Sequence, residues 1–134
     1  MKKLLFLVFL IIPLALVKGQ HQKPINELRV YELIDSTRNA FHDRFKAHAM
    51  RIMKKYNFKI IGTWETQLNN KTRFVYMLEW PDEKTMKEQW VKFRADQEWI
   101  DIKKVTAQKG TMVGEIDDWT LLPTEYSPYQ ANRK

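Results

Sequence analysis

The stretch FKIIGTWETQLNNKTRFVYMLEW, Phe58 to Trp80, decides the fold of this chain. It holds two runs rich in β-branched and aromatic residues, 58–67 and 72–80, joined by Leu68-Asn69-Asn70-Lys71. Asparagine tolerates the left-handed backbone conformation of tight turns, so the Asn pair suits a turn between two strands. The stretch therefore predicts an antiparallel β-hairpin.

A helix is predicted on each side of this hairpin. The segment from Arg38 to about Tyr56 follows the helix-capping side chains of Asp35-Ser36-Thr37, and Asn57 ends it. Pro81-Asp82-Glu83 is typical of the start of a second helix. A short further helical piece includes Trp99 and Ile102. The first helix carries one apolar stripe, Phe41, Phe45, Ala49, Ile52 and Tyr56, and the second an inner face of Met86, Trp90 and Phe93.

Two more strands complete the pattern. Glu27 to Ile34 alternates as a strand does, and Met112 to Leu122 forms a final strand that Pro123 ends. The order is then β, α, β, β, α, β. Right-handed crossovers place both helices on one face of a four-stranded antiparallel sheet. The predicted fold class is therefore α+β, a ferredoxin-like βαββαβ plait.

Both faces of the predicted sheet are apolar. We assign Phe58, Ile60 and Trp64 to one side of their strand and Ile61 to the other. In the next strand, alternation separates Phe74, Tyr76, Leu78 and Trp80 from Val75 and Met77. The helices cover only one face, so a second copy, or else the chain termini, must cover the other. We predict a homodimer with a closed or nearly closed barrel at its centre.

The first residues predict export. Lys2 and Lys3 precede an apolar run from Leu4 to Val17, and Gly19 offers a cleavage position. The run has about 14 residues and contains Pro13, whereas a membrane-spanning helix needs roughly 20. We therefore expect a cleaved signal peptide, no membrane span after cleavage, and a periplasmic or secreted protein. Cleavage would lower the formal net charge from +7 to +4, because residues 1–19 contain three lysines and no acid.

The composition limits the possible chemistry. The chain has no cysteine, which excludes disulfides, thiolate catalysis and zinc–thiolate or iron–sulfur sites. No phosphate-binding loop, dinucleotide-binding fingerprint, nucleophile elbow or HExxH motif occurs. Export argues against a nucleic-acid partner. The basic outer face of the first helix is read as a solvated surface, with contact to an anionic membrane or phosphate as the alternative.

The histidines of the first predicted helix have two interpretations. His42 and His48 lie six residues apart, roughly 120° around a helix, so they cannot close on one metal ion, and no metal site is predicted. His48 is either a packed residue at the margin of the apolar stripe or the wall of a pocket, where it is the candidate catalytic residue. We expect His42 to be solvated. Tyr31, His48, Trp64 and Tyr76 are the predicted lining of a small cavity, although such aromatics can also be plain core.

Five segments together resemble the exported bacterial branch of the NIPSNAP family. They are ELRVYEL (27–33), RFKAH (44–48), GTW (62–64), FRADQEW (93–99) and LLPTEYSP (121–128). Asp35-Ser36 and Gln97 depart from the family pattern at a turn and a helix end. The resemblance implies the dimeric α/β barrel superfamily, but no established reaction. We therefore expect the chain to consist of a signal peptide (1–19), a flexible segment (20–26), a NIPSNAP-like domain (27–123) and an extended tail (124–134).

Three hypotheses for function follow. The first is a homodimer that binds a small apolar ligand between helices and sheet, with or without acid–base or oxygenase-like chemistry. The second is a non-catalytic interaction protein with a filled core. The third is haem binding through His48; no other cofactor is predicted. Whether the protein is an enzyme stays open at this point.

Overall fold

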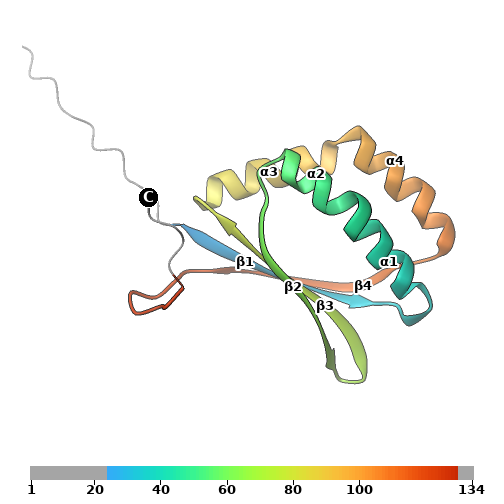
Figure 1. Ribbon diagram of the computed structural model, residues 1–134, viewed down its shortest axis with the longest axis horizontal. Coiled ribbons are helices and arrows are strands. Elements are labelled where there is room, and N and C mark those ends of the chain that lie inside the picture. The colour runs from blue at the N-terminus through green and yellow to red at the C-terminus, as the bar shows by residue number, and fades with distance from the viewer. Residues whose placement is uncertain (1–23, 130–134) are drawn as a thin grey trace, which may run out of the picture.

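The computed structural model describes residues 24–129, so the predicted signal peptide and the last five residues lie outside the described part. Figure 1 shows a sheet of four strands with all the helices on one face. The strands lie in the order β2-β3-β1-β4, and each neighbouring pair is antiparallel. The predicted α+β ferredoxin-like plait is confirmed. The strands are β1 (Ile25–Leu33), β2 (Lys59–Leu68), β3 (Lys71–Trp80) and β4 (Val113–Leu121).

The β2–β3 hairpin forms as predicted. Asn69 and Asn70 both have positive φ angles, 53° and 59°, which is the backbone that a two-residue hairpin turn requires. β3 carries the centre of the core on alternate residues. Its side chains on the helix side are nearly inaccessible: Phe74, Tyr76, Leu78 and Trp80.

The first helical segment runs from Arg38 to Lys55 as α1 (Arg38–Arg44), a π-helical turn (Phe45–Ala49) and α2 (Met50–Lys55). The predicted apolar stripe has two successive spacings of four residues, from Phe41 to Phe45 and on to Ala49, and all three residues are buried. A spacing of four overshoots one α-helical turn by about 40°. The wider π turn absorbs this excess, which keeps the stripe on the sheet.

Aspartates begin the remaining two helices, α3 (Glu83–Ala95) and α4 (Gln97–Thr106). Asp82 accepts a hydrogen bond from the Thr85 backbone N–H at 2.7 Å, and Asp96 accepts one from that of Trp99 at 3.0 Å. These are N-cap contacts, and they satisfy backbone donors that the first turn leaves free.

Asp96 also joins α4 to the end of the first helical segment. Its buried carboxylate accepts hydrogen bonds from Lys55 and from the Tyr56 hydroxyl, each at 2.7 Å. These bonds, Lys55 first, and the Trp99 N–H hold the pKa of Asp96 well below its ordinary value. As the pH falls, the Asp96 carboxylate therefore takes up a proton in the unfolded chain at a higher pH than in the folded protein. The stability that this carboxylate contributes is present above about pH 4 and is lost below it.

We predict that Asp96→Asn lowers the free energy of unfolding at neutral pH by about 1–3 kcal/mol, because asparagine still caps the helix but loses the charged hydrogen bonds. Urea unfolding at neutral and acidic pH measures this, with exposed Asp101→Asn as the control. The variant should also lose part of the acid-dependent destabilisation. An unchanged acid dependence in Asp96→Asn would contradict the assignment.

The outer face of the sheet, turned away from the helices, is largely apolar. Leu28 at its centre pairs with Met77 on β3 and Trp119 on β4, and Val30 pairs with Val75. The outer sheet face is the set Leu28, Val30, Trp64, Val75, Met77, Trp119. Trp64 and Trp119 are 52% and 48% exposed.

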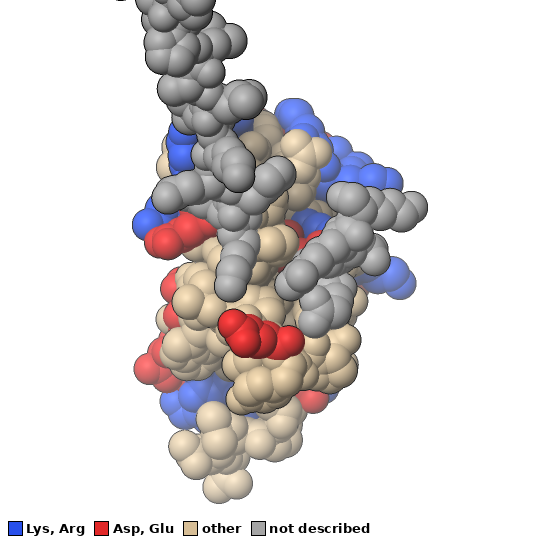
Figure 2. Space-filling model, turned by 90° about the vertical axis from the view of Figure 1, so that its left-hand side faces the viewer, with Lys and Arg blue, Asp and Glu red and all other residues tan. Residues whose placement is uncertain are grey.

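The tail after β4 turns back toward one end of this outer face. Residues 122–124, Ser127 and Tyr129 line a shallow groove with Met77 and Asn26. The Tyr129 hydroxyl donates a hydrogen bond to Glu79. Figure 2, which views the molecule from this side, shows Lys and Arg at the top over the helical layer, Asp and Glu along the left edge, and one acidic side chain in an otherwise uncharged middle.

Candidate functional site

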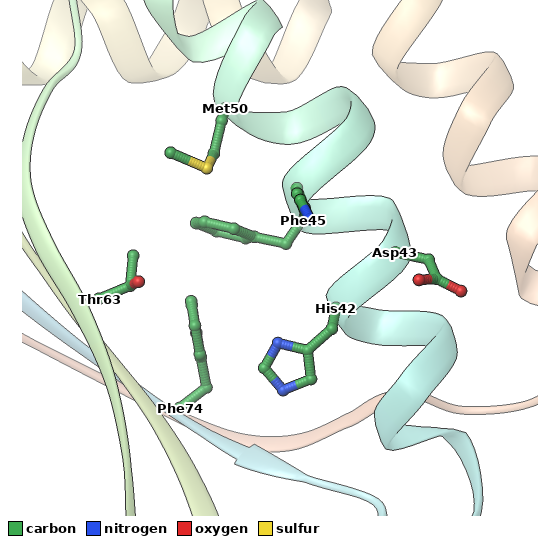
Figure 3. Close-up of a pocket in the computed structure, with 7 residues that line it drawn as sticks. His42, Asp43, Phe45, Met50, Thr63 and Phe74 are labelled. Atoms are coloured by element: carbon green, nitrogen blue, oxygen red, sulfur yellow. The ribbon is translucent and has the colours of Figure 1, made fainter.

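A half-open groove of about 380 Å³ lies between the first helical segment and strands β2 and β3. In Figure 3 the rings of Phe45 and Phe74 approach one another across it, with Met50 at one end and His42 at the other. The two phenyl centroids are 4.7 Å apart. The full lining is His42, Asp43, Phe45, Lys46, Met50, Thr63 and Phe74.

His42 belongs to a polar cluster at the groove's edge. Its Nε2 lies 2.7 Å from Oε1 of Glu65 on β2, and the Arg38 Nε–H donates to the same oxygen at 2.9 Å. Arg38 and His42 are four residues apart on α1, so they share one helix face. Hydrogen bonds from Arg38 and His42 hold the pKa of Glu65 below its ordinary value, so the carboxylate is ionised at neutral pH.

The ring of His42 is held on two sides. It packs edge-on against Phe41 and Phe74, with centroid distances of 5.5 and 5.7 Å. Because Nε2 faces Glu65, the second ring nitrogen is free to face the groove. Figure 3 shows one ring nitrogen directed toward the space between Phe45 and Phe74. Among the hydrogen bonds of residues 24–129, none engages Nδ1 of His42.

A β-bulge in β2 produces this arrangement. The pairing with β3 shifts between Ile60, opposite Leu78, and Gly62, opposite Met77. One extra residue reverses the faces of every later residue of the strand. Thr63 and Glu65 consequently point toward the helices, and Trp64 points to the outer sheet face. The predicted assignment of Trp64 to the same side as Ile60 is therefore wrong.

The structure brings together two of the four residues predicted to line a cavity. The hydroxyls of Tyr31 and Tyr76 lie 2.9 Å apart. Tyr76 is fully buried and packs against Phe45 at a centroid distance of 5.4 Å. Burial, and then the neighbouring Tyr31, raise the pKa of Tyr76 well above its ordinary value. Tyr31 and Tyr76 are thus part of the packed interior next to the groove and do not line it.

The other two predicted residues lie elsewhere. Trp64 is half-exposed on the outer sheet face, with its ring lying over Gly62. His48 is partly buried in the π-helical turn and is not among the residues that line the groove. The groove instead uses His42, which we had expected to be solvated and whose side chain is 39% exposed.

A buried ionic cluster was also missed. Glu27 is 4% exposed, and its carboxylate accepts hydrogen bonds at 2.9–3.0 Å from the indole N–H groups of Trp80 and Trp90. Arg29 pairs with it at 3.0 Å and stacks over the Trp90 ring at 4.4 Å. Glu32, on the same strand, instead forms a cross-strand ion pair with Arg73.

Residues 24–129 contain no group of three or more His, Asp or Glu side chains placed to hold a metal ion. Within the same residues, no helix has the length and apolar character required to cross a bilayer.

Comparison with known proteins gives a family match. The family model described as NIPSNAP matches residues 26–128. No curated protein matches the sequence.

Solved structures give matches over most of the chain. A NIPSNAP-like domain protein from Burkholderia xenovorans has a TM-score of 0.69 at 21% identity, covering 83% of this chain and 94% of that one. A NIPSNAP family protein from Agrobacterium tumefaciens has the same TM-score at 19% identity, covering 80% and 99%. A monooxygenase from Streptomyces coelicolor, solved with the ligand Nanaomycin D, scores 0.50 at 10% identity, covering 76% and 88%.

Proposed function

Because this chain belongs to the NIPSNAP family, we propose that it acts as an exported homodimer that binds a small, largely apolar ligand in the groove between helices and sheet. The observation that carries the proposal is the open groove itself. It is lined by two phenyl rings and has a histidine at one end, His42, which Glu65 holds in place by a hydrogen bond. Concave, mostly apolar sites with a few convergent polar groups are the usual form of small-molecule sites.

The outer sheet face supports the homodimer. Met77, Leu28 and Trp119 lie side by side on β3, β1 and β4, and Trp64 on β2 and Trp119 stand half-exposed on this face. Exposure of these apolar side chains to water is unfavourable, and the outer sheet face of a second copy of this chain offers a matching apolar surface. Export is proposed from the sequence of residues 1–19.

A ligand-binding role is consistent with what folds of this kind accommodate. The Streptomyces coelicolor monooxygenase, a similar fold, was solved with Nanaomycin D. The likeness is of fold, and it carries no reaction to this chain. The second candidate is a non-catalytic interaction protein, which the filled interior around Tyr31 and Tyr76 favours.

The groove can be tested with toluene as a neutral apolar probe. We predict that toluene shifts backbone amide NMR signals from residues 42–50, 63 and 74, in protein purified from cells that express the full chain. Thr63→Trp should weaken this binding at least about tenfold, because the indole fills the groove. The matched control is Val91→Trp on the exposed face of α3, which should bind normally.

Two results would contradict the proposed site. One is saturable binding whose signal changes map to the tail groove around Met77 and Tyr129. The other is an absence of saturable binding to the native protein, which would favour the interaction-protein candidate.

A further inference from the structure

We propose that the groove selects small aromatic molecules that carry a hydroxyl group, and that this hydroxyl donates a hydrogen bond to Nδ1 of His42. The inference rests on the proposed function, since it names the ligand class of the same groove. It is carried by the direction in which His42 is held.

The partner of His42 sets the hydrogen-bonding character of its ring. An ionised carboxylate only accepts hydrogen bonds, so Nε2 of His42 must carry the proton that it donates to Glu65. In the neutral imidazole the other nitrogen then has no proton and is an acceptor. Arg38 keeps Glu65 ionised through its two hydrogen bonds to that carboxylate. The neutral ring therefore presents an acceptor, Nδ1, to the groove, whereas the protonated ring does not.

The side chains that line the groove favour a ligand with an aromatic ring. Phe45 and Phe74 meet at an interplanar angle of 65°, and a ligand ring beside them can make edge and face contacts of the kind that aromatic pairs prefer. Met50 adds a polarisable apolar end. A planar ring in this position places a substituent close to His42.

A hydroxyl in this position has a defined advantage. Nδ1 of His42 loses contact with water when the ring enters, and it must regain a hydrogen bond or remain unsatisfied. A phenol supplies the donor. A ligand of the same shape without a donor leaves the nitrogen unpaired, and sites of this type reject such analogues.

The test compares phenol with anisole and toluene by the same amide NMR titration. Anisole keeps the oxygen but replaces the hydroxyl proton by a methyl group, and toluene lacks the oxygen. We expect phenol to bind at least about tenfold more tightly than anisole. His42→Phe should reduce this ratio to near one while toluene binding is retained. His48→Phe, outside the groove lining, should leave the ratio unchanged.

The pH dependence provides a second readout. Protonation of Nδ1 removes the acceptor, so phenol affinity should fall on acidification while toluene affinity does not. His42→Phe should abolish this difference in pH dependence between phenol and toluene. Glu65 on β2 and Arg38, Asp43 and Lys46 on the helical segment are the charged groups around the groove and its histidine.

The outcomes separate the two proposals. If none of the three compounds binds in the groove, the proposed function fails. If all three bind there with equal affinity, or if His42→Phe keeps the preference for phenol, the groove remains a site but the role of His42 is refuted.

Discussion

Glu27→Ala is expected to lower the free energy of unfolding by about 3–5 kcal/mol, a large part of the stability of a domain of this size. The carboxylate is buried and binds three donors at once: the indoles of Trp80 and Trp90 and the guanidinium of Arg29. Truncation leaves two buried indole N–H groups without an acceptor, and among residues 24–129 it leaves Arg29 only the exposed carboxylate of Asp118 as an ion-pair partner. Urea unfolding followed by far-ultraviolet circular dichroism measures the loss.

The control for this substitution is Glu98→Ala. Glu98 pairs with Arg51, but both side chains are half-exposed, and solvent-exposed pairs of that kind contribute little to stability. Similar losses in the two variants would contradict the view that the cluster around Glu27 is a central element of the core.

Leu28→Asp is expected to raise the dissociation constant of the proposed homodimer by at least about 100-fold. Leu28 lies at the centre of the outer sheet face, between Met77 and Trp119. Two-fold symmetry would bring two such carboxylates into the middle of one apolar interface, where neither finds a cation. Analytical ultracentrifugation over a range of concentrations measures the change.

Val91→Asp is the matched control, because it adds the same charge to an apolar position that is 65% exposed on α3. This variant should stay dimeric. Wild-type protein that is monomeric at all concentrations, or a dimer that Leu28→Asp leaves intact, would show that the outer sheet face is not the interface.

Much of the fold could be predicted because local signals agree with one another. The Asn69-Asn70 turn, the alternation in β3 and the aspartate cap of α3 each indicate one structure without help from distant residues. The strand order then follows from handed crossovers. The spacing of Phe41, Phe45 and Ala49 also identified the buried stripe, even though a π-helical turn presents it.

The candidate site could not be predicted in the same way, because one residue of register changes it completely. Ile61 is the extra residue in β2, and the alternation counted through it placed Trp64 on the same side as Ile60. Gly62 was the available signal, since an isolated glycine within a strand often marks a bulge. A Cβ there would come within 2.6 Å of the Trp64 ring.

The Glu27 cluster has a different reason for escaping prediction. Its members come from β1, β3 and α3, and only the packing of α3 on the sheet brings Trp90 to the carboxylate. A glutamate in an alternating strand is ordinarily a solvent-facing residue. Nothing within ELRVYEL distinguishes Glu27 from Glu32, which lies on the other face and meets Lys71 and Arg73.

The most direct test of the account is a crystal structure of the protein, purified from cells that express the full chain, in complex with 4-bromophenol. The anomalous signal of bromine locates the ligand without reference to any assumed position. The account predicts the ring in the groove beside Phe45 and Phe74, with its oxygen within hydrogen-bonding distance of Nδ1 of His42. An empty groove with bromine bound at another site would contradict the claim that this groove is the functional site.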